Sequence, residues 1–478
     1  MTFTVLSDQQ INTLLESLTI DEIEDLRKAL AQALNQYSGG AQDVEGDVFQ
    51  EPREASTLHA ETEVKTRFSS ACGPGGIASK DRPLSDMDTP DAPTGALTLF
   101  SPNGAPLALL ATPTLTPFRT ALSSACLLWK RASIKTLTVF GAGSQAYWHI
   151  RLALMLRGPT IRHVNIINHR FSSSAASILK RFTLIPQEVK DREGWGTAKF
   201  SVLTQGFVEY SRLVKEYMRE ADVIYCCTKG HDGAEGLFDP SILTSHEGRK
   251  KGRLICAVGG VEGQRRELPD DLVKLVTKRH VGQHRHIHKH ADEGGVIVVD
   301  TLAGAMKHAT ELLTAGVEPG QMVELGELVM LHRLKLEEEA AEAELSAATS
   351  SSQLSSDVDL ESLSVESYNR TPSMSAIYGS GSSNQRSSSR SPRSSTTDLP
   401  RSPASSSPSR KGSFPLPFRR SSGGQEDKPK KEGQLARWMR DGTVVYRSVG
   451  VSVMDLVVGL EIVRLAREKA IGTQVADL

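Results

Sequence analysis

Apolar residues recur at helical spacing over residues 4–36, and two helices are expected there. Ser7 or Asp8 can cap the first helix. Thr19 and Glu22 have the spacing of a capping box at the start of the second, "IDEIEDLRKALAQAL". The chain is therefore expected to begin with a small amphipathic helical segment.

The pattern is irregular and rich in Gly, Pro and Asp from about residue 45 to 110, with one clear pair of strands. Two apolar runs in "GALTLFSPNGAPLALLAT" flank Asn103 and Gly104, and an Asn-Gly pair between apolar runs favours a hairpin. The next segment, "TPTLTPFRTALSSACLLWKRA", predicts a helix that begins near Thr116 or Pro117.

Short apolar runs then alternate with helical segments. Helices are predicted for 144–156 and 172–182, and strands for "TLTVFG", "HVNIINH", "VIYCCT", "RLICAVGG" and "GVIVVD". Such alternation is typical of a parallel sheet that carries helices on both faces. The predicted fold class is therefore α/β.

The segment 346–432 differs in kind, because it is rich in Ser, Pro and Arg and has almost no aliphatic residues. It cannot bury enough apolar surface to offset chain entropy, and we expect it to be disordered. Its Ser-Pro pairs, at Ser391, Ser402 and Ser407, are either substrates for kinases or part of an inert spacer. Regular structure is expected to resume near residue 433 with a strand and an amphipathic helix.

The 478 residues carry a formal net charge of -1, which argues against long-range steering toward nucleic acid or an anionic membrane. No apolar run is long enough to span a bilayer, and "MTFTVLSDQQ" lacks the features of a secretory signal. The five cysteines are scattered without zinc or disulfide spacing, so we expect reduced, mostly buried thiols. These observations favour a cytoplasmic protein with small-molecule partners.

The run "GAGSQA", Gly141–Ala142–Gly143–Ser144–Gln145–Ala146, follows a predicted strand and opens a predicted helix. In a G-x-G-x-x-A fingerprint, the first glycine permits the tight turn and the second lets the backbone approach a pyrophosphate. The small third residue lets helix and strand pack closely. The alternative is an ordinary glycine turn, but the context favours a dinucleotide site.

The end of the second strand bears on the choice of cofactor. An acidic residue there binds the ribose of NAD, whereas a nearby Arg accommodates the 2'-phosphate of NADP. This chain has Asn168, His169 and Arg170, so NADP(H) is preferred and NAD(H) is possible, unless Arg170 is only a solvated loop residue. Three further residues are expected to line the same crevice at later strand ends: Thr228, Val258 and Gly260.

Five segments occur in the order found in the ornithine cyclodeaminase and mu-crystallin family, which the chain resembles: "TPFRTALSSA", "VFGAGSQA", "LICAVGG...REL", "VVDTLAGAMKHA...GEL" and "YRSVGVSVMDLVVGLEIVRLA". The resemblance implies a Rossmann-like NAD(P)-binding domain over 133–335. It also implies a discontinuous α+β substrate and dimerisation domain, built from 1–132 and 433–478, in a homodimer. Family members cyclise ornithine to proline with loss of ammonia, or reduce cyclic ketimines and related imino acids.

The resemblance also assigns candidate site residues. Arg119 in "TPFRTA" matches the arginine that grips the substrate carboxylate, for which its planar fork is suited. Arg53 in "QEPREAS" is similar to a second substrate arginine, and Lys65 in "TEVKTRF" to a lysine that assists proton transfer. The family's "MP" before that lysine is absent here, and a solvated Lys65 or a surface Arg119 is the alternative.

The main departure from the family follows the strand "LICAVGG". Cyclodeaminases of this family carry an Asp two residues beyond the first glycine, where it acts on the amino group, but this chain has Val261. Either Glu262 replaces the Asp after a one-residue shift, or the chain resembles the mu-crystallin branch, which does not use it.

Three functions follow from these observations. The first is NAD(P)-dependent reduction of a ketimine or another small imino or amino acid, since a complete cofactor loop occurs beside the missing Asp. The second is ornithine cyclodeamination. The third is a non-catalytic NADPH-binding protein.

Two further features are expected to play minor roles. His284, His286, His288 and His290 alternate with basic residues, which favours a solvated insertion over a metal site. Asp300, which ends the strand "GVIVVD", is expected to shape the cofactor crevice or the joint between the domains.

Overall fold

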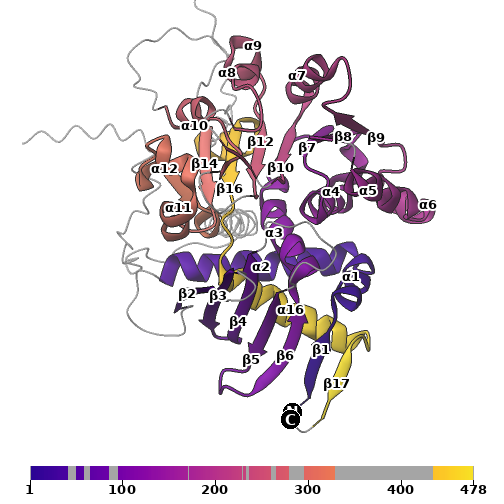
Figure 1. Cartoon of the computed structure of the whole chain (residues 1–478), viewed down its shortest axis with the longest axis vertical. Coiled ribbons are helices and arrows are strands. Elements are labelled where there is room, and N and C mark those ends of the chain that lie inside the picture. The colour runs from indigo at the N-terminus through magenta and orange to yellow at the C-terminus, as the bar shows by residue number, and fades with distance from the viewer. Residues whose placement is uncertain are drawn as a thin grey trace, which may run out of the picture.

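The computed structural model describes residues 2–40, 50–58, 65–84, 95–170, 172–228, 230–232, 236–259, 265–278, 295–328 and 434–476. These residues form two units, each built on a sheet, one above the other in Figure 1. The N and C termini lie together at the lower end, because strand β1 (Phe3–Leu6) pairs with β17 (Thr473–Val475).

The lower sheet is made by both ends of the chain. Its other strands are β2 (Gln50–Leu58), β3 (Lys65–Gly73), β4 (Gly76–Leu84), β5 (Ala96–Phe100) and β6 (Pro106–Ala111). Among the described residues the order is β17-β1-β6-β5-β4-β3-β2, antiparallel except for the pair β1–β6. The helices of this unit are α1 (Asp8–Glu16), α2 (Ile20–Gly40), α3 (Thr112–Leu128) and α16 (Ser452–Glu468), of which α16 contacts β3, β4 and β5.

The upper sheet has parallel strands only, within the part of the chain that is described. The strands are β7 (Thr136–Phe140), β8 (His163–Asn168), β9 (Lys199–Thr204), β10 (Val223–Cys226), β12 (Leu254–Ala257), β14 (Gly295–Val299), β15 (Met322–Glu324) and β16 (Thr443–Arg447). Their order is β15-β14-β16-β12-β10-β7-β8-β9. The chain runs outward from β7 to β9 and then returns to the other side of β7, so a topological switch point lies between β7 and β10.

Helices cover both faces of this sheet, as the sequence pattern predicts (Figure 1). Val223 and Tyr225 of β10 join one core, shared with α4 (Ser144–Arg157) and α5 (Ser173–Leu184). Ile224 and Cys226 join a second core on the opposite face. The helices of that face include α7 (Tyr210–Glu220), α8 (Ser241–Thr244), α10 (Asp270–Thr277), α11 (Leu302–His308) and α12 (Thr310–Thr314). The predicted α/β class is confirmed.

The remaining elements are short. They are the helices α6 (Gln187–Arg192), α9 (His246–Arg249) and α15 (Gln434–Asp441), the 3-10 turns η1 (Gly158–Thr160) and η2 (Pro319–Gln321), and the paired strands β11 (His231–Asp232) and β13 (Arg265–Arg266). None of the described helices is both long and apolar enough to cross a membrane.

The predicted domain boundary at residue 433 is wrong in one respect. Residues 433–478 were expected to belong wholly to the lower unit, but β16 lies in the middle of the upper sheet, parallel to β12 and β14. Its sequence, "TVVYR", is an apolar strand buried on both faces, which suits a central position in a parallel sheet. The chain then returns to the lower unit with α16.

Local signals in the sequence identify several elements correctly. Ser7 forms a capping box with Gln10, and Thr19 forms one with Glu22. The hairpin β5–β6 turns at Gly104, which has a φ of +84°. Helix α3, however, begins about one turn earlier than predicted, because the carboxylate of Asp8 accepts hydrogen bonds from the N–H and hydroxyl of Thr114 at 2.7 and 2.9 Å.

Candidate active site

The glycine-rich loop has the geometry predicted for a phosphate cradle. Gly141 has a φ of +101°, and a β-carbon there would lie 2.5 Å from the carbonyl oxygen of Cys227. A β-carbon at Gly143 would meet nothing within 4 Å, so the backbone at Gly143 faces open space. Gly143 is the N-cap of α4 and has no side-chain cap, while Ala146 is fully buried. The first N–H groups of α4 are therefore oriented to bind an anion.

The loop after β8 is held by Asn168. Its Nδ2 donates hydrogen bonds to the carbonyl oxygen of Arg170 at 2.8 Å and to Oγ of Ser172 at 3.3 Å. Ser172 in turn caps α5 through the N–H of Ala175. The side chains of His169 and Arg170 are exposed at the carboxyl edge of the sheet.

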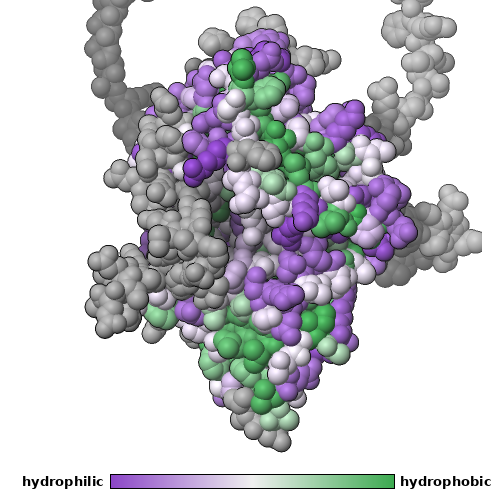
Figure 2. All heavy atoms as spheres, turned by 45° about the vertical axis from the view of Figure 1, so that its right-hand side comes forward, coloured by the Kyte–Doolittle hydropathy of each residue, from purple (hydrophilic) through white to green (hydrophobic). Residues whose placement is uncertain are grey.

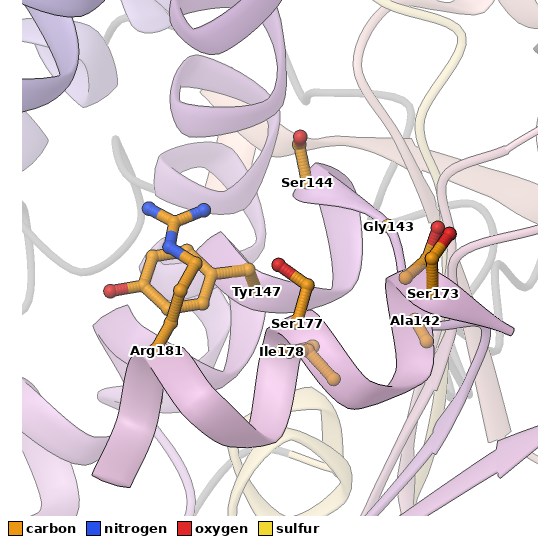
Figure 3. A pocket seen from close by; sticks show the side chains of 9 residues that line it. Ala142, Gly143, Ser144, Tyr147, Ser173, Ser177, Ile178 and Arg181 are labelled. Atoms are coloured by element: carbon orange, nitrogen blue, oxygen red, sulfur yellow. The ribbon is translucent and has the colours of Figure 1, made fainter. Parts of the chain in front are cut away.

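A pocket of about 370 Å³ opens between α4 and α5, beside the glycine loop. Figure 3 shows the hydroxyl groups of Ser144, Ser173 and Ser177 around it, with Arg181 lying across the ring of Tyr147. The guanidinium carbon of Arg181 is 3.3 Å from the centre of that ring. The pocket therefore lies beside the glycine loop and is lined by three serine hydroxyls and one guanidinium group.

The same two residues connect the pocket to the lower unit. The hydroxyl of Tyr147 donates to Oε1 of Glu16 at 2.6 Å, and Nη2 of Arg181 donates to the same oxygen at 2.8 Å. Glu16 is the last residue of α1. This contact fixes α4 and α5 against the N-terminal helices.

Three buried charged residues form a cluster in the lower unit. Asp455 of α16 pairs with Arg119 of α3 through Nε–Oδ1 at 2.9 Å and Nη2–Oδ2 at 3.4 Å. Lys80 of β4 places its Nζ 2.9 Å from the same Oδ1. Burial alone would raise the pKa of the Asp455 carboxyl, but the charges of Arg119 and Lys80 outweigh it and lower the pKa. Two cations thus contact the same carboxylate.

Asp300, which follows β14, connects this cluster to the carboxyl edge of the upper sheet. Its Oδ2 accepts hydrogen bonds from the N–H groups of Val449 and Gly450 at 2.9 and 2.7 Å, and its Oδ1 accepts one from the hydroxyl of Tyr446. A β-carbon at Gly450 would lie 2.8 Å from the guanidinium nitrogens of Arg119. The predicted role of Asp300 at the joint between the domains fits these contacts.

Thr228 and Val258 follow β10 and β12, so they lie at the carboxyl edge of the sheet beside the glycine loop. Gly260, Glu262 and the departure at Val261 lie outside the described residues, as do the Ser-rich segment and the His284–His290 stretch. Among the residues that are described, no group of three His, Cys, Asp or Glu side chains could hold a metal ion.

The lysine beside Arg119 is Lys80, which the sequence analysis did not single out. Lys65 begins β3, and Lys80 pairs with Ser69, four residues farther along that strand. At about 3.3 Å per residue the two positions are separated by roughly 13 Å along the strand. The side chains of Lys65 and Arg53 lie outside the described part of the chain, so their predicted roles stay predictions.

Two sequence signals point to the missed residues. Lys80 shares a strand face with the buried Ala78, because alternate residues of β4 point to the same side. Asp455 stands among apolar residues in the first turns of α16, "SVMDLVVGL", and is 3% exposed. Each is a charged residue at a position where the pattern predicts an apolar one, which requires a partner nearby.

No protein-family model matches the sequence. An uncharacterized cyclodeaminase of Dictyostelium discoideum is 32% identical over 159 residues, which are 32% of this chain and 41% of that relative. The matched part thus spans about two fifths of the relative's length.

Several solved structures share the architecture of the whole chain. Delta(1)-pyrroline-2-carboxylate reductase of Thermococcus litoralis, in complex with NADH and L-proline, is 14% identical with a TM-score of 0.56, over 99% of this chain and 100% of that one. Iminosuccinate reductase of Paracoccus denitrificans, in complex with NAD+, is 14% identical with a TM-score of 0.56, over all of both chains. A probable ornithine cyclodeaminase of Bordetella pertussis Tohama I is 16% identical with a TM-score of 0.55, over 98% and 99%.

These likenesses define the class of fold, a Rossmann-like domain joined to a discontinuous α+β domain. The chain has the fold of the ornithine cyclodeaminase and mu-crystallin family, as the motifs in its sequence predict.

Proposed function

We propose that the chain is an NAD(P)H-dependent reductase of a small imino acid. The observation that carries the proposal is the buried cluster of Lys80, Arg119 and Asp455, joined through Gly450 and Asp300 to the carboxyl edge of the upper sheet. Ligands of open parallel sheets bind at this edge, next to the switch point. Two structures with the same fold are reductases named for imino acids and are described with NADH or NAD+.

Arg119 suits a substrate carboxylate. Arg119 and Lys80 converge on the same carboxylate, so a substrate carboxylate bound at Arg119 would lie close to a second cation. The Nη1 of Arg119 donates to Sδ of Met454 at 3.5 Å, and a thioether is a weak acceptor that a carboxylate can displace. The main chain at Gly450 packs against the two Nη atoms of Arg119 and thereby orients the guanidinium group.

Lys80 suits the proton transfer that the resemblance assigns to Lys65. NAD(P)H, when bound, supplies a hydride to the imine carbon. The ammonium of Lys80 gives a proton to the imine nitrogen, so that the C=N bond becomes a CH–NH unit. Lys80 is oriented by Oγ1 of Thr116 at 2.8 Å and by Asp455, in a site with little access to water.

The cofactor is expected to lie along the carboxyl edge of the upper sheet. The loop Gly141–Ala146 would bind the pyrophosphate, and Thr228 and Val258 would line the nicotinamide half. We propose a preference for NADPH, because no carboxylate occurs in the loop 168–172 and Arg170 is exposed in that loop.

We also propose that two copies of the chain associate through the outer face of the lower sheet. In an antiparallel sheet with one solvated face, the outward residues are ordinarily polar. Here Phe68 and Leu109 are 40% and 37% exposed, and Val475 is 37% exposed. Figure 2 shows apolar atoms gathered over this lower part of the molecule, which favours a homodimer.

Ornithine cyclodeamination is the second candidate, favoured by the name of the Dictyostelium relative. It requires a group that moves a proton at the amino nitrogen, and Val261 has none. Ammonia release from ornithine by the purified protein, without net NADH production, would support this function over imine reduction.

The direct test is oxidation of NADPH, followed by its absorbance, with a panel of cyclic and open-chain imino acids. The wild type should oxidise NADPH with at least one of them, and Lys80→Met should lose this activity. Lys28→Met is a matched control, because Lys28 is an exposed lysine that also pairs with an aspartate. A wild type that binds NADPH but reduces no imino acid would favour a non-catalytic protein.

A further inference from the structure

Glu267 is buried at the carboxyl edge of the upper sheet and has no role in the function proposed above. It lies between β13 and α10 and is 1% exposed. Its Oε1 accepts hydrogen bonds from the N–H and hydroxyl of Thr228 at 3.1 and 3.3 Å, and its Oε2 accepts one from the N–H of Gly259 at 2.8 Å. One carboxylate therefore holds the main chain where it leaves two neighbouring strands, β10 and β12.

The main-chain segments at these strand ends are packed closely against one another. A β-carbon at Gly259 would lie 1.7 Å from the carbonyl oxygen of Thr228, and one at Gly141 would lie 2.5 Å from that of Cys227. The loop after β12 thus packs on the loop after β10, which packs on the glycine loop after β7. A displacement of the Glu267 carboxylate would therefore also displace the loops after β12, β10 and β7, which form the proposed cofactor site.

A third strand joins the same contact. Nη1 of Arg447, the last residue of β16, donates to the carbonyl oxygen of Gly259 at 2.8 Å and lies 3.7 Å from Oε2 of Glu267. Nε of Arg447 lies 2.9 Å from Oε1 of Glu311 on α12. All three charged side chains are at most 1% exposed, so one guanidinium is shared between two buried carboxylates.

We propose that Glu267 is a positioning residue that fixes the strand ends under the nicotinamide half of the cofactor in the arrangement that hydride transfer needs. The inference rests on the proposed function. Hydrogen bonds from main-chain N–H groups to a charged acceptor are about twice as strong as neutral ones. Groups held in place before the reaction do not have to be reorganised during it.

The surroundings of Glu267 predict that its carboxyl becomes protonated near neutral pH and that protonation weakens these hydrogen bonds. Burial raises the pKa of Glu267 to about 7, against the opposing effects of Arg447 and the two N–H groups, and Glu311 adds to the rise. The thiols of Cys226 and Cys227, at the end of β10, stay neutral because burial raises their pKa values well above the ordinary one. A neutral carboxyl is the weaker acceptor, so the strand ends are expected to loosen below about pH 7.

Two variants test the inference. Glu267→Gln keeps one oxygen acceptor but turns an NH2 group toward the other main-chain N–H. Glu311→Gln removes the same charge from the cluster and leaves both of the Glu267 hydrogen bonds to main-chain N–H in place. Amide hydrogen exchange at Thr228 and Gly259 should become about tenfold faster in Glu267→Gln and stay unchanged in Glu311→Gln. In both proteins, exchange in β8 serves as the internal reference.

NADPH titrations across pH 5.5–8.5 provide the second measurement. In the wild type the affinity for NADPH should rise with pH, and the midpoint of this rise should lie near pH 7. In Glu311→Gln the midpoint should move to a lower pH. In Glu267→Gln the affinity should be lower and independent of pH. Unchanged exchange at Thr228 and Gly259 in Glu267→Gln would overturn the inference. If Glu267→Gln does not fold, an unmoved midpoint in Glu311→Gln overturns it instead. If the wild type binds no NADPH, the proposed function fails, while the exchange measurement still decides whether Glu267 holds the strand ends.

Discussion

Gly450 lies directly against the guanidinium of Arg119, and no side chain would fit between them. A β-carbon at Gly450 would be 2.8 Å from both Nη1 and Nη2 of Arg119, and Gly450 has a φ of +75°. Its N–H donates to Asp300 at 2.7 Å. The end of β14 in the upper sheet therefore fixes the position of the proposed substrate-binding arginine in the lower unit.

Gly450→Ala should displace the guanidinium of Arg119 and lower kcat/KM for the imino acid about a hundredfold, because small shifts of positioning groups have effects of this size. Gly316→Ala is the matched control. Gly316 has a φ of +74°, and a β-carbon there would meet nothing within 4 Å. Both variants carry a backbone strain of about 1 kcal/mol, so a similar loss of activity in both would contradict the displacement of Arg119.

Asp455→Asn should destabilise the protein by about 3–5 kcal/mol, because it removes the buried carboxylate that pairs with both Arg119 and Lys80. Lys80→Met should cost less, since the pair of Arg119 and Asp455 remains balanced. Urea denaturation measures both free energies of unfolding. Equal losses in the two variants would mean that the three charges do not act as one cluster.

The same carboxylate predicts a dependence of stability on pH. The pKa of Asp455 is lowered in the folded protein from an ordinary value of 3.8, so the folded state binds its proton less readily than the unfolded state. The stability that it contributes is present above pH 3.8 and is lost as the pH falls through the folded-state pKa. Thermal denaturation between about pH 5 and 2 should show a steeper fall in the wild type than in Asp455→Asn.

Arg170→Ser should weaken the binding of NADPH about tenfold and leave NADH nearly unaffected, because only NADPH carries a 2'-phosphate to pair with the guanidinium. Arg162→Ser is the control, since Arg162 is an exposed arginine at the opposite edge of the same sheet, just before β8. Isothermal titration of the wild type and both variants with each nucleotide gives the six affinities. A loss for both nucleotides would place Arg170 near a group that they share.

Leu109→Lys should convert the proposed dimer into a monomer, because it places a charge in the apolar outer face of the lower sheet. Val208→Lys adds the same charge at an apolar residue that is 101% exposed elsewhere. Light scattering after size-exclusion chromatography gives the two masses. A wild-type monomer, or a Leu109→Lys dimer, would contradict this interface.

The sequence predicts those parts of the molecule that depend on local or periodic signals. The caps at Ser7 and Thr19, the turn at Gly104 and the strand-turn-helix at Gly141 are all set by neighbouring residues, and each is present. The strands β3 and β4 were missed because "KTRFSSACG" and "GIASKDRPL" have few apolar residues. Their pairing is set by a tight turn and by neighbouring strands.

Contacts between distant segments explain the rest of the differences. Asp8 extends α3 from 106 residues away in the sequence, and Lys80 reaches Asp455 across 375 residues. The central place of β16 in the upper sheet is also a long-range pairing, which the apolar pattern of "TVVYR" does not specify. Such contacts leave no periodic signal, and they are the ones that build the proposed substrate site.

The most direct test of the account is a fluorescence titration with NADPH on the wild type, Gly143→Asp and Gly320→Asp. A β-carbon meets nothing within 4 Å at either glycine, so both variants should fold, but only Gly143 lies at the start of α4. We predict micromolar binding by the wild type and Gly320→Asp, and none by Gly143→Asp, because the added carboxylate occupies the space of the pyrophosphate. Equal binding by all three proteins, or no binding by the wild type, would contradict the assignment of this loop as the cofactor site.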